Sequence, residues 1–153
     1  MTMALHEEKM HCALALAREA ELNGEVPVGA VIVLDGEIIA EGYNQVISTN
    51  DPTAHAEIIA LRQAANAIGN YRLVDATLYS TLEPCCMCAG ALVHARIKTL
   101  YFAACDPKAG ACGSQFQLVD NDVLNHKIDW HAKLLQEESS TMLKNFFKQR
   151  RLK

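Results

Sequence analysis

The stretch VGAVIVLDGEIIAEGY, residues 28–43, predicts a β-hairpin early in the chain. Val28 to Leu34 is an apolar run of strand length, Asp35-Gly36 is a favoured two-residue hairpin turn, and Glu37 to Tyr43 is the returning strand. The hairpin sets two neighbouring strands of a sheet, and the rest of the chain adds helices and strands to it.

Helical and strand patterns alternate around this hairpin, with polar loops between them. The expected helices cover residues 4–22, Asp51-Pro52 to Ile68, Glu83-Pro84 to about Ala95, Gln117 to Leu124, and Leu134 to Arg151. The further expected strands are Ala76 to Thr81, Thr99 to Ala104 and Lys127 to Trp130, and the expected loops are Asn44 to Thr53 and Asp106 to Ser114. This order predicts an α/β fold, a three-layer α-β-α sandwich around a mixed sheet of about five strands.

The composition predicts one domain that does not enter a membrane. The 153 residues suit a single domain spanning 1–153, and half of them are apolar, enough for a sizeable core. No apolar run reaches the roughly 18 residues that a bilayer requires, and Met1 to Lys9 lacks the apolar core of a signal peptide. We therefore expect a cytoplasmic location and no membrane partner.

The charge distribution leaves a nucleic-acid partner open. The net charge of −4 argues mildly against binding phosphate groups. The last ten residues, 144–153, nevertheless hold five basic side chains and no acidic one. Such a tail suits either a local RNA contact or a solvated helix end whose cations complement the helix dipole.

Cysteines cluster at the expected start of a helix. Of the six, at positions 12, 85, 86, 88, 105 and 112, three stand in Cys85-Cys86-Met87-Cys88, which suits a metal or redox site better than a disulfide framework. Cys85 and Cys88 are neighbours on one helix face, whereas Cys86 is rotated by about 100°. A helix N-terminus also favours thiolate, so the pair is either a zinc-binding pair or a redox dithiol.

His55-Ala56-Glu57 supplies the remaining chemistry. His55 adds a third zinc ligand to Cys85 and Cys88, and three protein ligands leave the fourth zinc position open, as in catalytic sites. Glu57 lies two residues on, about 200° around a helix, so both can serve one site if His55 stands at the very start of its helix. One zinc per chain and Glu57 as a proton shuttle are the parts of a hydrolytic deaminase.

The two motifs resemble the H-x-E and P-C-x-x-C signature of the cytidine deaminase superfamily. From about residue 5 to 151, further segments look like the family of bacterial tRNA-specific adenosine deaminases. These segments are Val26-Pro27-Val28-Gly29-Ala30-Val31, Tyr71-Arg72-Leu73, Thr81-Leu82-Glu83-Pro84-Cys85, Asp106-Pro107-Lys108, Gly113-Ser114, Asn125-His126 and Asn145-Phe146-Phe147.

The resemblance implies a cytidine deaminase-like fold, a homodimer, and conversion of the wobble adenosine of a tRNA anticodon stem-loop to inosine. It also implies roles for residues outside the zinc site. Asn44 would contact the flipped base or its ribose, and Asp106 and Lys108 would lie on the RNA-facing loop. The remaining expected substrate-binding residues are Asn125 and His126 in the anticodon pocket, and Phe147, Arg150 and Arg151 on the C-terminal tail.

Other functions stay open on the sequence alone. A deaminase of free nucleobases or nucleotides, acting on guanine or cytosine, would use the same zinc machinery, and the net acidity favours it. A non-catalytic zinc module that binds tRNA for a partner would have no need of Glu57. A thiol redox protein would need neither His55 nor Glu57.

Overall fold

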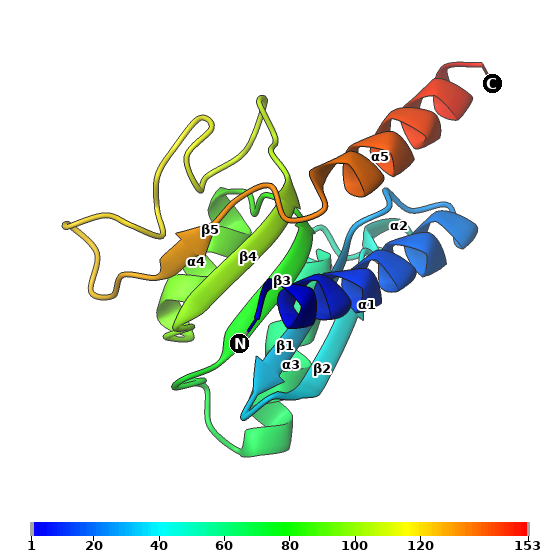
Figure 1. Ribbon diagram of the computed structural model, residues 1–153. Helices are drawn as coiled ribbons and strands as arrows, with labels where there is room; N and C mark the ends of the chain where they lie inside the picture. The colour runs from blue at the N-terminus through cyan, green and yellow to red at the C-terminus, as the bar shows by residue number, and fades with distance from the viewer. Residues whose placement is uncertain (1, 153) are drawn as a thin grey trace.

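The computed structural model describes residues 2–152 (Figure 1). In chain order the elements are α1 (Met3–Leu22), β1 (Gly29–Leu34), β2 (Glu37–Tyr43), α2 (Val46–Thr49), α3 (Ala56–Ile68), β3 (Thr77–Leu82), α4 (Cys86–His94), β4 (Thr99–Ala104), β5 (Asp129–His131) and α5 (Gln136–Arg151). None of the helices among these residues is both long and apolar enough to cross a bilayer.

The five strands form one mixed sheet in the order β2-β1-β3-β4-β5. β1 pairs antiparallel with both β2 and β3, whereas β3, β4 and β5 run parallel. The predicted hairpin is confirmed: Leu34 pairs with Glu37, and Asp35 and Gly36 both have positive φ, as a twisted two-residue turn requires. The expected α/β class and five-stranded mixed sheet are confirmed.

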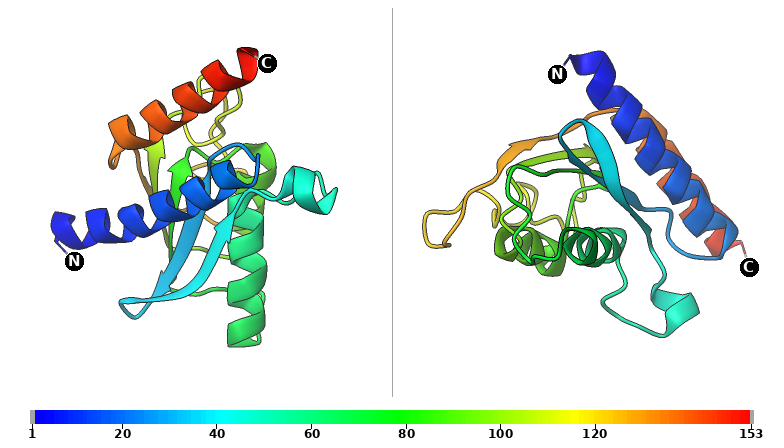
Figure 2. Two further views of the ribbon diagram at one scale, coloured as in Figure 1. Left: turned by 90° about the vertical axis from the view of Figure 1, so that its right-hand side faces the viewer. Right: turned by 90° about the horizontal axis from the view of Figure 1, so that it is seen from below.

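Helices cover both faces of the sheet (Figure 2). α1 and α5 lie on one face, and α3 and α4 lie side by side on the other. Alternate residues of β1 serve the two cores: Val31 and Val33 pack with the α1 side, and Ala30 and Ile32 pack with the α3 and α4 side. This is the expected three-layer sandwich.

Gly42 lets α3 approach the sheet closely. A Cβ at this position of β2 would collide with the Ala56 carbonyl oxygen and lie 2.9 Å from the Ala60 nitrogen. Both are backbone atoms of α3, so a side chain at residue 42 would push the helix away. The absence of a side chain at residue 42 therefore lets the first turns of α3 pack directly against β2.

The predicted start of the second long helix was wrong. Instead of capping a helix, Asp51 accepts hydrogen bonds from the Thr53 backbone N–H (2.9 Å) and the Thr53 hydroxyl (2.7 Å), which closes a local turn. α3 therefore starts only at Ala56, with His55 as its N-cap residue. α4 likewise starts later than predicted, at Cys86.

Two loops also differ from expectation. The polar loop after β2 contains the short helix α2, whose Ile47 and Ser48 N–H groups donate to the Glu25 carboxylate at 3.0 and 2.7 Å. No helix forms over Gln117 to Leu124. In a helix the Val119 carbonyl oxygen would accept from the Val123 N–H, but here it accepts from the Ile128 N–H at 2.7 Å.

Candidate active site

A cavity of about 910 Å³ lies beyond the carboxyl ends of β3 and β4. Crevices at this edge of α/β sheets are the usual ligand sites. The first turn of α3, the start of α4, the loop after β4 and the last turns of α5 all contribute to its wall. The lining residues are Val26, Val28, Asn44, His55, Glu57, Leu82, Glu83, Cys85, Cys105, Asp106, Pro107, Lys108, Ala109, Leu143, Lys144, Phe147, Arg150 and Arg151.

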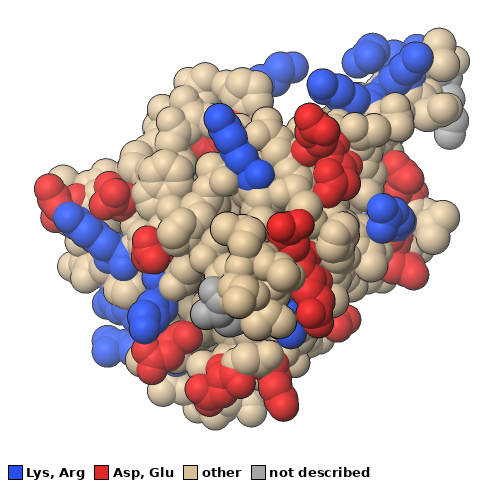
Figure 3. All heavy atoms as spheres, viewed as in Figure 1, with Lys and Arg blue, Asp and Glu red and all other residues tan. Residues whose placement is uncertain are grey.

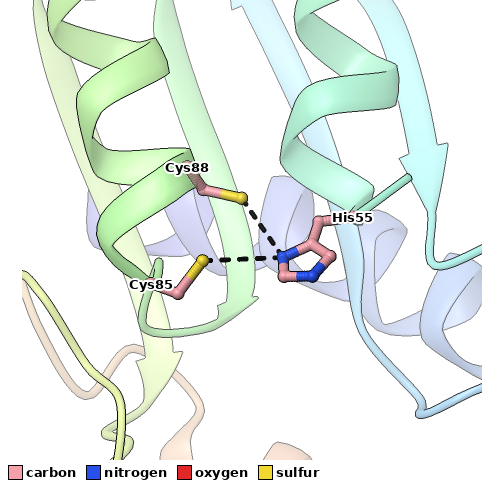
Figure 4. A group of neighbouring side chains, drawn as sticks. All are labelled: His55, Cys85 and Cys88. Atoms are coloured by element: carbon pink, nitrogen blue, oxygen red, sulfur yellow. Dashed lines mark hydrogen bonds between the residues drawn. The ribbon is translucent and has the colours of Figure 1, made fainter. Parts of the chain in front are cut away.

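His55, Cys85 and Cys88 converge at this cavity (Figure 4). The His55 Nδ1 atom lies 3.6 Å from the Cys85 sulfur and 3.4 Å from the Cys88 sulfur. Zinc–sulfur bonds of about 2.3 Å and zinc–nitrogen bonds of about 2.0–2.1 Å at tetrahedral angles put ligand nitrogen and sulfur about 3.6 Å apart. The observed spacing and donor set therefore fit one zinc ion with three protein ligands.

Two helix starts place these ligands. His55 and Cys85 are the N-cap residues of α3 and α4, each with an extended backbone, and Cys88 is buried in the first turn of α4. The side chain of an N-cap residue can point beyond the end of its helix. This orientation lets His55 face the same site as Glu57, although the two residues are only two positions apart. A hydrogen bond from Cys88 lowers the pKa of Cys85 to about 3 although burial opposes it, which favours the thiolate that metals bind.

Glu57 lies in the same wall, on the first turn of α3. Only 4% of the residue is exposed, and this burial raises the pKa of its carboxyl to about 7. A carboxyl with such a pKa can both accept and release a proton near neutrality. Glu57 lies beside His55, Cys85 and Cys88, but its carboxylate is not among the converging atoms that could bind a metal ion.

Most of the expected substrate-binding residues reach this cavity. Asn44 lines it while its Oδ1 accepts from the Ala56 N–H at 2.9 Å, which caps α3 from a neighbouring segment. Asp106 accepts from the Lys108 and Ala109 N–H groups at 3.0 and 3.2 Å, and so shapes the turn that carries Lys108. From α5 come Phe147, Arg150 and Arg151.

Asn125 and His126 do not line this chain's own cavity. β5 pairs in parallel with β4, with Asp129 opposite Thr99, so the segment before β5 lies at the amino end of β4. The cavity lies at the other end of that strand. His126 instead contacts the Ile97 carbonyl oxygen through Nε2 at 2.7 Å.

Glu83 is a buried residue of the site that sequence reasoning assigned only to a helix start. Its carboxylate accepts from the N–H groups of Asp106 (3.0 Å), Cys112 (3.0 Å) and Ser114 (3.1 Å), and from the Ser114 hydroxyl. It therefore holds the loop after β4 beside the metal ligands. The available signal was an acidic residue beside Pro84-Cys85, together with a loop that has small residues at Gly110 and Ser114.

Comparisons with known proteins agree with this geometry. The sequence profile of the cytidine and deoxycytidylate deaminase zinc-binding region matches residues 3–104. The tRNA-specific adenosine deaminase of Haemophilus influenzae is 55% identical over 146 residues, covering 95% of this chain and 84% of that protein. The tRNA-specific adenosine deaminase of Agrobacterium fabrum is 46% identical, with 98% and 99% covered.

Solved structures share the fold. One, from a study of A-to-I editing by tRNA:A34 deaminases at the wobble position, superposes with a TM-score of 0.86 at 46% identity, covering 89% of this chain and 99% of that one. The guanine deaminase of Nitrosomonas europaea, at 24% identity and a TM-score of 0.81, covers 92% of this chain and 83% of its own, and shares the fold. The chain therefore belongs to the zinc-binding cytidine and deoxycytidylate deaminase superfamily and, within it, to the family of the tRNA-specific adenosine deaminases.

Proposed function

We propose that this chain hydrolyses the wobble adenosine of a tRNA anticodon loop to inosine and releases ammonia. One observation carries the proposal. A single cavity joins Glu57 and the three converging ligand residues to Lys108 and the basic end of α5. This arrangement puts hydrolytic chemistry beside groups that attract a phosphate backbone.

The reacting end of the cavity accounts for the hydrolysis. His55, Cys85 and Cys88 would hold the zinc ion, which would act as a Lewis acid and lower the pKa of water to about 7. Glu57 takes a proton from the attacking water and delivers it to the adenine ring nitrogen. A second transfer through Glu57 lets the amino group leave as ammonia, so that water and adenosine become inosine and ammonia.

The outer wall accounts for binding of an RNA base. The Oδ1 of Asn44 is occupied by the Ala56 N–H, which leaves its Nδ2 donor for the flipped base or ribose. Phe147, 44% exposed at the cavity, offers an apolar face for stacking. Lys108 and Arg151 supply positive charge at the same wall, and Asp106 holds the turn that presents Lys108.

The assembly that we propose is a homodimer of one-domain chains, acting in the cytoplasm where tRNA is available. The dimer would give a role to Asn125 and His126, which lie away from this chain's own cavity. In a dimer they would meet RNA that is bound at the partner's cavity.

The deciding experiment offers two classes of substrate to the zinc-loaded protein. We expect inosine in nuclease digests of an anticodon stem-loop with adenosine at the wobble position, and none from a matched stem-loop with guanosine there. Ammonia release from free guanine and cytosine is measured in parallel. Rapid turnover of a free base with no inosine in the stem-loop would replace this proposal by that of a nucleobase deaminase.

A further inference from the structure

We infer that Arg150 is a positioning residue that fastens the α5 wall of the cavity to the segment before β1, rather than a contact to RNA phosphate. The inference rests on the proposed function, because it concerns how that cavity is held in shape for its substrate. It separates Arg150 from Arg151, the adjacent residue on the same helix.

The Arg150 side chain is engaged on two sides within the protein. Its guanidinium donates a hydrogen bond to the Gly24 carbonyl oxygen at 2.9 Å. Its central carbon also lies 4.9 Å from the centre of the buried Phe146 ring, in cation–π contact. The hydrogen bond to Gly24 ties the last turn of α5 to the chain just after α1, and the contact with Phe146, one turn earlier on α5, orients the guanidinium.

Glu25 extends the connection toward the reacting groups. This residue is 1% exposed, and its carboxylate accepts from the Ile47 and Ser48 N–H groups at the start of α2. Burial raises the pKa of Glu25, but these hydrogen bonds and the positive charge of Arg150 outweigh burial and hold the pKa below its usual value. Glu25 directly follows Gly24, whose carbonyl oxygen accepts from Arg150.

The segment that Glu25 holds leads directly into the site. α2 lies between Asn44, which caps α3, and His55, the N-cap residue of α3. Val26 and Val28, which follow Glu25, line the cavity themselves. Arg150 and Glu25 thus hold three walls together: α5, the segment before β1, and the loop before α3.

Arg151 differs although it lines the same cavity. It is rotated by about 100° from Arg150 around α5, and among residues 2–152 its guanidinium has no hydrogen bond or ion pair. The basic side chains that gather at the end of α5 are visible in Figure 3. Within that cluster, Arg151 is free for phosphate and Arg150 is already committed to the protein.

The test compares Arg150→Ala, Arg150→Lys and Arg151→Ala, with Arg18→Ala as a control for loss of charge on exposed α1. Editing of the anticodon stem-loop is measured as kcat and KM, and binding is measured at several salt concentrations. Arg151→Ala should raise KM, keep kcat, and make the slope of log affinity on log salt shallower by about 0.7. Arg150→Ala should keep that slope and lower kcat about tenfold. This loss is smaller than the loss of about 10²-fold in rate that follows when reacting groups are misplaced by about 1 Å.

Arg150→Lys distinguishes positioning from charge. A lysine keeps the charge but lacks the planar guanidinium that stacks and donates at once, so we expect it to behave like Arg150→Ala. Restoration of kcat by lysine, or a shallower salt slope in Arg150→Ala, would overturn the inference.

A measurement without RNA separates this inference from the proposed function. Amide hydrogen exchange at Ile47 and Ser48 should accelerate in both Arg150 variants and stay at the wild-type rate in Arg151→Ala, with zinc content unchanged in all. If the wild-type protein fails to edit the stem-loop, the proposed function is wrong, but the hydrogen-exchange result still supports the positioning role of Arg150. Unchanged exchange in Arg150→Ala would remove the positioning role alone.

Discussion

At the scale of single residues, the neighbouring cysteines Cys85, Cys86 and Cys88 have different surroundings. Cys88 is buried and converges with His55 and Cys85, whereas Cys86 is exposed and points away from that group. We expect Cys88→Ala to lose stoichiometric zinc, because two remaining ligands hold the ion poorly. Cys86→Ala should retain one zinc per chain when both proteins are analysed for metal after dialysis. Full zinc in Cys88→Ala would contradict the ligand set.

Glu57 gives a second test at this scale. Glu57→Gln keeps the size and polarity of the side chain but removes the acid–base group. We expect zinc content and thermal unfolding to stay as in wild type while inosine formation falls by about 10²- to 10⁴-fold. Turnover within tenfold of wild type would mean that another group carries the proton.

The residue types of the two motifs were enough to predict the central residues, because one histidine, two cysteines and a carboxylate that is not a ligand are the parts of a zinc-dependent hydrolase. His55 and Cys85 stand at helix starts, and the packing of α3 beside α4 brings them together. Glu83 escaped because its partners lie more than twenty residues away, at Asp106, Cys112 and Ser114. Sequence periodicity contains no information about such distant hydrogen bonds.

At the scale of elements, Gly42 in β2 and Gly90 in α4 lead to opposite predictions for substitution by alanine. Gly42 faces the backbone of α3, whereas a Cβ on Gly90 within α4 would meet nothing within 4 Å. Gly42→Ala should lower the free energy of unfolding by about 1–3 kcal/mol through overpacking. Gly90→Ala should raise it by about 0.5–1 kcal/mol because alanine favours a helix. Urea denaturation of the zinc-loaded proteins measures both, and equal midpoints would refute the close-packing argument.

The loop after β4 depends on one carboxylate. Glu83→Ala leaves the N–H groups of Asp106, Cys112 and Ser114 without their acceptor, and each unpaired donor costs about 1–3 kcal/mol when buried. We expect the loop to open locally, so that trypsin cleaves at Lys108 faster than in wild type. Ser114→Ala removes only one donor and serves as the milder control. Equal cleavage rates in Glu83→Ala and wild type would show that the loop holds without this carboxylate.

Elements with strong periodicity were predicted well, and those governed by side-chain hydrogen bonds were not. The hairpin and the strands β3 and β4 agree with prediction to within a residue or two. The start of α3 was misplaced because Asp51 satisfies Thr53 rather than a helix. The helix over residues 117–124 did not form because the Val123 N–H donates to the Asn121 side chain and the Val119 carbonyl oxygen accepts from Ile128, so the helical bond between residues 119 and 123 is absent.

At the scale of the whole molecule, a chain with a net charge of −4 must bind RNA through a local basic surface. The available side chains are Lys108, Lys148 and Arg151, because the Arg150 guanidinium is hydrogen-bonded to Gly24. Contacts to about two to three phosphates predict a slope of log affinity on log salt of about −1.4 to −2.1. The double variant Arg150→Ala with Arg151→Ala should make it shallower by about 0.7, the share of Arg151 alone. A steeper or unchanged slope would contradict this division.

Long-range topology explains why the position of one segment could not be predicted. Placing Asn125 and His126 required knowing that β5 runs parallel to β4 and with which register. The order of elements predicts a mixed sheet but not the direction of its last strand, so the side of the sheet reached by this segment could not be read from the sequence.

The contact between Glu83 and residue 110 limits how this enzyme can be re-engineered. The Glu83 carboxylate occupies the space where a side chain at Gly110 would begin. Positions 83 and 110 therefore form a coupled pair, although 27 residues separate them in the chain. A combinatorial library aimed at new substrates can diversify Lys108 and Ala109 freely. It must keep Gly110 constant, or vary it only together with a smaller residue at position 83.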